Sequence, residues 1–260
     1  MTPPNRRLRT GTSHVEQIPI TWAMPEPGAG RRGLVIWLPP GLSGMEAVQP
    51  DLERLAAAGF VAVSFDSWER GSRATEAPAT LQQRGRENWP LVAWPILGHG
   101  ALEVLRVMDW AVRSFDVAPP FSLGGVSLGG DLAVAAAGLD PRVGCVAAVV
   151  ATPDWTRAGR RVDGAPVVAG EPDAYARFFY DRIDPLTNPR SYAHRPTMTF
   201  ECGADDDRVP PVGALRFQRA LADVYGEMHE RVRVNLHPGV GHAVVPAMIE
   251  NCVAWLEEHG

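Results

Sequence analysis

The chain has 260 residues, of which 45% are hydrophobic and 21% are charged, and its formal net charge is −5. This length and balance predict one large domain with a buried core, residues 1–260, and are ordinary for a soluble globular protein. All 25 basic residues are arginines spread along the chain, so we expect no nucleic-acid partner. The lack of lysine excludes Schiff-base chemistry, a Ser-Lys dyad and a P-loop.

The N-terminal residues do not have the pattern of an export signal. Residues 1–10 contain three arginines, but no apolar stretch of signal length follows them. No other segment is apolar enough to suggest a membrane span. We therefore expect a cytoplasmic protein that has no membrane partner. Cys145, Cys202 and Cys252 are widely spaced and lack C-x-x-C pairing, which predicts small core residues and no metal site.

Apolar runs of strand length alternate with helical patterns along the chain. This order predicts an α/β fold with a mostly parallel central sheet and helices on both faces. The expected strands are 15–24, 33–38, 61–65, 121–126, 145–150, 197–202 and 231–236, and the segment 25–32 is expected to turn after an antiparallel edge strand. The expected helices are 45–58, 100–115, 128–138, 211–225 and 245–258.

Two stretches interrupt this alternation. Residues 67–95 are rich in Arg, Glu and Trp without a clean period, which predicts a long surface excursion. Residues 151–196 follow a strand and contain a short helical pattern with four aromatic rings, which predicts a small lid insertion. One helix face cannot bury all four rings, so Phe178 and Phe179 are candidates to bind substrate and to limit acyl length. The alternative is that these rings only pack the insertion onto the domain.

The sharpest motif is G-x-S-x-G at residues 125–129, between a predicted strand and a predicted helix. A serine on such a tight turn is exposed at the carboxyl edge of the sheet, and the flanking glycines let backbone and side chains clear one another. Ser127 is therefore the candidate nucleophile. The alternative is a glycine-rich turn with an inert serine.

A serine hydroxyl needs a base, and the base in turn needs an acid to orient it. His242 lies in a glycine-rich loop directly after the last predicted strand, so it should reach the same sheet edge, whereas His237 lies at the strand end and is expected to be structural. The acid should come from the run Asp205-Asp206-Asp207, which follows the strand 197–202. The residues alone leave open which aspartate serves.

An oxyanion needs two backbone N–H donors that point at it. The residue after the nucleophile, Leu128, and a residue in the loop after the first parallel strand, Leu42, are the candidates. Gly41 allows the turn that would direct the Leu42 amide inward.

With these motifs the chain resembles the dienelactone-hydrolase and prolyl-oligopeptidase-like branch of the α/β-hydrolases, especially small bacterial carboxylesterases. The resemblance covers roughly residues 33 to 258. It is carried by segments 39–42, 65–73, 125–129, 203–210 and 239–242. In that family the acid lies three residues after the strand-end glycine, which implies Asp206. Dienelactone hydrolases proper use a cysteine nucleophile, so Ser127 implies a different activity.

These residues predict a carboxylic-ester hydrolase that uses Ser127, His242 and Asp206 on a small, short-chain ester. Each part of the reaction has a protein group assigned to it, so no metal or organic cofactor is expected. Two alternatives are a serine peptidase or amidase of the oligopeptidase type and a non-catalytic binding protein with the same fold. The oligomeric state and the natural substrate stay open.

Overall fold

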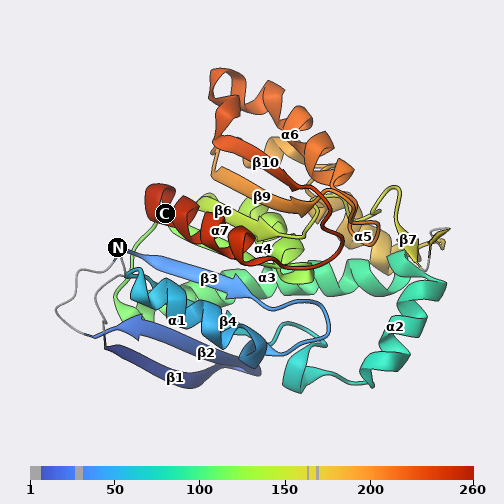
Figure 1. The fold of residues 1–260 in the computed structure, drawn as a ribbon. Helices are drawn as coiled ribbons and strands as arrows, with labels where there is room; N and C mark the ends of the chain where they lie inside the picture. Colours follow the sequence, from blue (N-terminus) through green and yellow to red (C-terminus); the bar gives the residue numbers. More distant parts are fainter. Residues whose placement is uncertain (1–6, 27–31, 163, 168–169) are drawn as a thin grey trace.

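A computed structural model describes residues 7–26, 32–162, 164–167 and 170–260, and its centre is one eight-stranded sheet (Figure 1). The strand order is β1-β2-β4-β3-β5-β6-β9-β10. The bounds are β1 Leu8–Val15, β2 Ile18–Pro25, β3 Leu34–Leu38, β4 Val61–Phe65, β5 Phe121–Val126, β6 Val143–Val149, β9 Thr197–Gly203 and β10 Val232–His237. The six strands from β4 to β10 are parallel, and β1 and β2 pair antiparallel at one edge. The predicted mostly parallel α/β sheet is confirmed.

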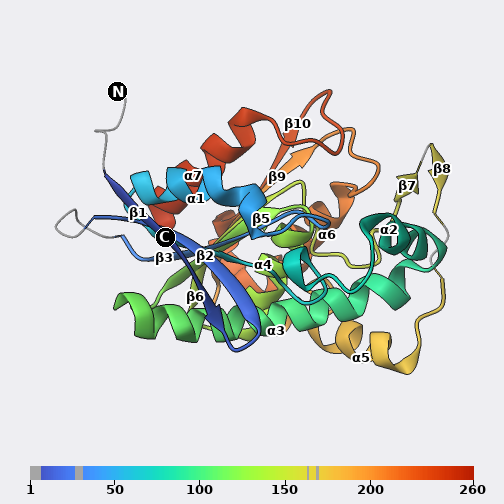
Figure 2. The ribbon, with the colours of Figure 1, turned by 90° about the horizontal axis from the view of Figure 1, so that it is seen from below.

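Helices cover both faces of this sheet (Figure 2). Helices α1 (Gln49–Ala57) and α7 (Pro246–His259) pack on one face, where Leu52 and Met248 join the buried strand residues. Helices α3 (Trp89–Phe115), α4 (Leu128–Leu139) and α6 (Val212–Tyr225) bury their apolar sides on the other face. Strands β3 to β6 are buried almost throughout, as expected for parallel strands covered on both sides.

The N-terminal edge differs from the prediction, because residues 15–24 do not form one strand. The chain forms a hairpin of β1 and β2 instead, and it turns at Glu16, whose φ of 53° is left-handed. A polar Glu-Gln pair supplied the turn where sequence analysis expected continuous strand. The turn expected at 25–32 falls mainly on residues 27–31, which lie outside the described residues.

The excursion predicted at 67–95 is largely helical. It contains α2 (Pro78–Glu87), and α3 begins at Trp89 rather than at residue 100. Pro90 is tolerated in the first turn of α3, and Asn88 caps the helix by accepting a hydrogen bond from the Leu91 amide at 3.1 Å. Pro95 lies inside the helix, which hid its continuity in the sequence. By length and hydropathy α3 could span a membrane, but 67% of that apolar window is buried within the fold, as in a core helix.

The described residues of the segment 151–196 form a hairpin, helix α5 and a 3-10 turn at Pro189–Tyr192. A short hairpin of β7 (Arg161–Val162) and β8 (Ala165–Pro166) comes first, and helix α5 (Ala174–Ile183) follows. Helix α5 packs on α3, where Gly98 leaves room for the ring of Phe179. A Cβ at position 98 would lie 2.1 Å from a carbon of that ring.

Candidate active site

Ser127 lies at the sharp turn between β5 and α4. Its φ and ψ of 51° and −119° are outside the regions that L-residues normally adopt, which is a strained conformation that the surrounding structure must hold. Two glycines make the turn possible. A Cβ at Gly125 would lie 2.6 Å from the Leu38 carbonyl oxygen, and one at Gly129 would lie 2.3 Å from the same atom. The turn therefore requires glycine at both positions.

His242 lies in the loop after β10 and reaches Ser127 across the edge of the sheet. Its Nε2 is 3.1 Å from the Ser127 Oγ, and its side chain is 15% exposed. The ring is therefore close enough to take the hydroxyl proton and open enough to meet a substrate. His237 lies elsewhere: its Nε2 is 2.6 Å from the carboxylate of buried Glu201.

Of the three consecutive aspartates, Asp206 alone is buried, and its Oδ2 lies 2.7 Å from Nδ1 of His242. Its Oδ1 accepts hydrogen bonds from the amides of Arg208 at 3.0 Å and Val209 at 2.8 Å. These bonds fix the carboxylate, which in turn can fix the imidazole with a proton on Nδ1. Asp205 and Asp207 are exposed.

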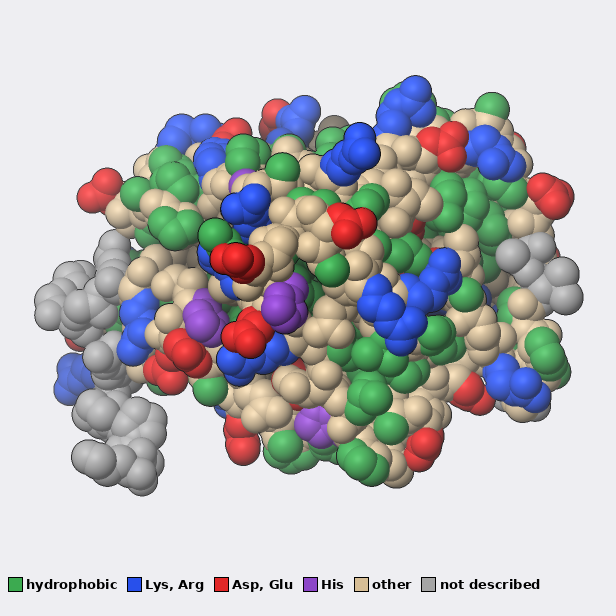
Figure 3. All heavy atoms as spheres, turned by 90° about the horizontal axis from the view of Figure 1, so that it is seen from above, with side chains coloured by type: hydrophobic (Ala, Val, Ile, Leu, Met, Phe, Trp, Pro, Cys, Tyr) green, Lys and Arg blue, Asp and Glu red, His purple; other side chains and the backbone are tan. Residues whose placement is uncertain are grey.

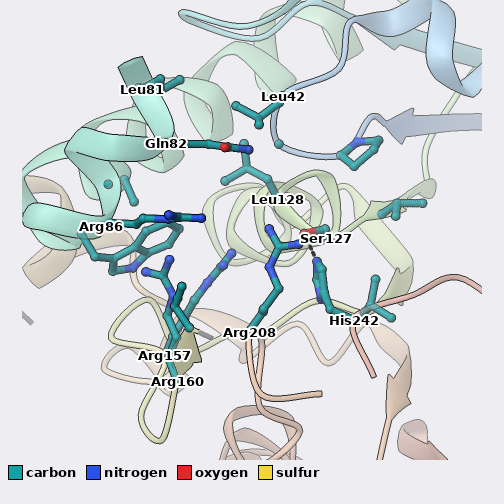
Figure 4. Close-up of a pocket in the computed structure, with 18 of the residues that line it drawn as sticks. Leu42, Leu81, Gln82, Arg86, Ser127, Leu128, Arg157, Arg160, Arg208 and His242 are labelled. Carbon is teal, nitrogen blue, oxygen red and sulfur yellow. Dashed lines mark hydrogen bonds between the residues drawn. The ribbon is translucent and has the colours of Figure 1, made fainter. Parts of the chain in front are cut away.

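The two leucines predicted to hold an oxyanion line the same cavity as Ser127, Leu128 next to it in the chain and Leu42 on the loop after β3 (Figure 4). Leu128 is the first residue of α4, whose N-terminal amides have no partner within the helix. Leu42 follows Gly41 in the loop after β3, and within the described residues neither leucine amide donates a backbone hydrogen bond. Both amides are thus free to receive an anionic oxygen.

The cavity above Ser127 has a volume of about 750 Å³, which suits a small-molecule ligand. Its walls come from the Leu42 loop, from α2 and the first turn of α3, and from residues 157–162. Sequence analysis missed Trp89, Arg157 and Arg160 in these walls. The signal was present, since both insertions are rich in arginine and tryptophan, but nothing in their spacing places them over the serine.

Phe178 and Phe179 do not line this cavity, which corrects their assignment to substrate binding. Phe179 is 4% exposed and packs against Gly98 and the ring of His99, whereas Phe178 is about half exposed. The lid predicted at 151–196 therefore contributes through residues 157–162 and not through α5. The packing alternative was correct for Phe179, because α3 provides the surface that hides its ring.

A buried ion pair lies one helical turn beyond Ser127. Asp131 is fully buried in α4, and its carboxylate pairs with Arg157 at 2.7 Å and accepts the Thr152 amide at 2.7 Å. Burial raises the pKa of Asp131, and the Arg157 guanidinium opposes that rise. The pair anchors the arginine-rich segment 157–162 to the helix that carries Ser127.

Among the residues that the structure describes, no three His, Cys, Asp or Glu side chains gather as a metal-binding group. Cys145, Cys202 and Cys252 are free and buried, and burial raises the pKa of each thiol.

A doubly covered parallel sheet with a serine on the turn after its central strand defines the α/β-hydrolase fold. Residues 103–259 match the model of the prolyl oligopeptidase family, so the chain belongs to that family of hydrolases.

Known proteins resemble the chain over most of its length. Esterase YjfP of Escherichia coli strain K12 is 24% identical over 212 residues, which cover 79% of this chain and 80% of the relative. The structure of TT1662 from Thermus thermophilus has a TM-score of 0.75 and 22% identity, covering 97% of this chain and 98% of that one. A Klebsiella pneumoniae protein provisionally named dienelactone hydrolase has a TM-score of 0.71 and 16% identity, with 96% and 98% coverage. The solved structures support the fold.

Proposed function

We propose that the protein hydrolyses a carboxylic ester through an acyl-enzyme formed on Ser127. The observation that carries this proposal is the hydrogen-bonded series from Asp206 to His242 to Ser127, which ends at a cavity large enough for a small molecule. The esterase name of the Escherichia coli relative agrees with it.

In the first step the Ser127 Oγ attacks the ester carbonyl while His242 Nε2 takes its proton. The carbonyl oxygen becomes an anion, which the amides of Leu42 and Leu128 stabilise. Asp206 stabilises the imidazolium that forms. The intermediate collapses as the carbon–oxygen bond to the alcohol breaks and His242 returns the proton to the leaving oxygen. Water then attacks the acyl-enzyme by the same route, which releases the acid and restores the serine.

The residues that line the cavity give less support to a peptidase or amidase activity. A site that selects a peptide by its free amine needs acidic side chains, and among the described lining residues Asp207 is the one acid beside six arginines. A binding protein without catalysis would not need the strained serine turn.

The test combines covalent labelling with a substrate panel. An organophosphonate should label Ser127 in the wild-type protein and leave Ser127→Ala unlabelled, as mapped by mass spectrometry. Nitrophenyl acyl esters should be hydrolysed, and Ser127→Ala should lose at least about 10³-fold in kcat.

The same panel includes aminoacyl anilides, which report on peptidase activity. A label on Ser43, the other serine that lines the cavity, would contradict the assignment of the nucleophile. Anilides hydrolysed faster than esters would contradict the ester preference.

A further inference from the structure

The cavity above Ser127 carries a strong excess of positive charge. Six arginines line it, and Asp207 is the one acid among the described residues that do so. The lining arginines are Arg70, Arg86, Arg157, Arg160, Arg161 and Arg208. This differs from the chain as a whole, whose net charge is −5, and from the face in Figure 3, where acidic and basic side chains are interspersed.

Few of these charges are neutralised within the protein. Arg157 pairs with Asp131, and Arg70 donates to the Glu69 carbonyl oxygen at 2.8 Å. For Arg86, Arg160 and Arg208 no carboxylate of the described residues lies within ion-pair distance. These three arginines are therefore free to bind an anion.

Several guanidinium N–H groups are both buried and without a hydrogen-bond partner among the described residues. They are the Nε of Arg70, the Nε of Arg157, and the Nε and Nη1 of Arg160. Arg70 and Arg157 are each 8% exposed, so water reaches them poorly. Buried donors of this kind cost free energy unless something accepts from them, and charged donors cost more than neutral ones.

The arginines are also held in place, which a binding site requires. The guanidinium carbons of Arg157 and Arg160 lie 4.2 Å and 4.5 Å from the ring centroid of Trp89. The Trp89 indole is itself fixed, because its Nε1 donates to the Trp155 carbonyl oxygen at 2.8 Å. Figure 4 shows the side chains of Arg86, Arg157 and Arg160 directed into the cavity, with Arg208 on the same side as Ser127.

The arginines around Arg160 disfavour its charged form. Burial is the main cause that lowers the pKa of Arg160 to about 10, and the charges of Arg157, Arg208 and Arg86 add to it. Burial likewise lowers the pKa of Arg70 to about 10. Both groups stay charged at neutral pH, so Arg157, Arg208 and Arg86 continue to repel the charge of Arg160, and a bound anion would offset this repulsion.

We propose that the ester substrate bears an anionic group, such as a carboxylate, that binds among Arg86, Arg160 and Arg208 while Ser127 attacks the ester carbonyl. This inference rests on the proposed esterase function and specifies its substrate class. The anionic group belongs to either the acyl or the alcohol part of the ester, and the experiment below separates these two sources. Guanidinium groups suit carboxylate oxygens because they offer several N–H donors in one plane.

The experiment compares matched esters with and without a negative charge. On the acyl side, mono-4-nitrophenyl glutarate is compared with 4-nitrophenyl valerate. On the alcohol side, 5-butyryloxy-2-nitrobenzoate is compared with 4-nitrophenyl butyrate, after each rate is normalised to alkaline hydrolysis. We expect one anionic ester to exceed its neutral partner in kcat/KM by at least about tenfold. The arm that shows this preference identifies the charged part of the substrate.

The preference should depend on the arginines and on salt. Arg160→Gln and the exposed Arg86→Gln should each lower the anionic-to-neutral ratio of kcat/KM by about tenfold or more. Arg219→Gln is the matched control, since Arg219 is exposed on α6 outside the cavity and should leave the ratio unchanged. Raising the ionic strength from about 0.02 M to about 0.5 M should reduce the ratio in the wild type.

A binding measurement separates this inference from the proposed function. By calorimetry, Ser127→Ala should bind the anionic ester of the preferred arm more tightly than its neutral partner, and Arg160→Gln added to that variant should remove the difference. The pair is monobutyl glutarate and butyl valerate for the acyl arm, or 5-butyryloxy-2-nitrobenzoate and 4-nitrophenyl butyrate for the alcohol arm. Equal affinities in both pairs, or neutral esters hydrolysed as fast as both anionic ones, would overturn the inference even if Ser127 is the nucleophile. Preferential binding without hydrolysis of any ester would overturn the esterase function and retain the anion site.

Discussion

Replacing Asp206 by asparagine tests the hydrogen-bonded series at its least exposed member. The Oδ1 of Asp206 accepts two backbone amides, and its Oδ2 faces Nδ1 of His242 at 2.7 Å. In Asp206→Asn the side-chain oxygen keeps the two amide bonds, because only an acceptor fits there. The new NH₂ group then faces Nδ1 and donates to it, so the proton of the neutral ring moves to Nε2.

A ring protonated on Nε2 cannot accept the proton of Ser127. The variant also lacks the negative charge of the Asp206 carboxylate, which stabilises the imidazolium in the transition state. The combined effect should lower kcat by up to about 10⁴-fold, which at 1.36 kcal/mol for each factor of ten corresponds to about 5 kcal/mol of transition-state stabilisation. KM should change little, since Asp206 does not line the cavity.

The assay is kcat and KM on a nitrophenyl butyrate, with the fold checked by circular dichroism and thermal unfolding. Asp205→Asn is the matched control, because Asp205 is the adjacent carboxylate but is exposed and lies outside the cavity. It should retain activity within a small factor. Equal losses in the two variants, or a loss in Asp206→Asn explained by unfolding, would refute this reasoning.

Three further predictions concern the turn, helix α5 and pH. Gly129→Ala should lower both activity and the free energy of unfolding, the latter by about 1–3 kcal/mol, because the new Cβ would lie 2.3 Å from the Leu38 carbonyl oxygen; a variant with unchanged Tm and activity would contradict this. Phe179→Ala should cost about 3–5 kcal/mol of stability yet leave the acyl-length profile unchanged, since the ring is buried outside the cavity; a shift toward longer acyl chains would restore its role in substrate binding. Burial raises the pKa of Asp184 to about 7 in the folded protein, above its ordinary 3.8, so its stabilising contribution is complete below about pH 4 and is lost as pH rises through 7. Urea unfolding between pH 5 and 8 should show a smaller decline in stability for Asp184→Asn than for the wild type, and parallel declines would contradict the assignment.

The sheet and the serine turn were predictable because their signals are local. Strands β4 and β5 have the predicted bounds, since each is a short run that is buried throughout, and Asp66 follows β4 while Pro120 precedes β5. Ser127 directly follows β5, and Asp206 and His242 lie in the loops that follow β9 and β10. Parallel strands bring their carboxyl ends to one edge, so the three side chains could be expected to meet there.

The cavity walls were not predictable in the same way. Helix α2 lacks an apolar stripe, with Leu81 and Gly85 its only buried residues, so periodicity could not reveal it. The placement of residues 157–162 depends on the ion pair between Arg157 and Asp131, a contact between segments that are distant in sequence. The role predicted for the aromatic residues of α5 was wrong for a related reason. Whether Phe179 faces substrate or core is decided by Gly98, which lies on another helix.

The separation between these two sets of residues has an evolutionary consequence. Ser127, Asp206 and His242 are held by the sheet, whereas Trp89, Arg86 and Arg160 belong to segments that connect sheet elements at the surface. Surface insertions tolerate substitution and changes in length far better than strands do. A lineage can therefore exchange α2 or the segment 157–162 and acquire a new specificity without altering a single reacting atom. Grafting these two segments between homologues is accordingly the most direct route to redesigning this enzyme.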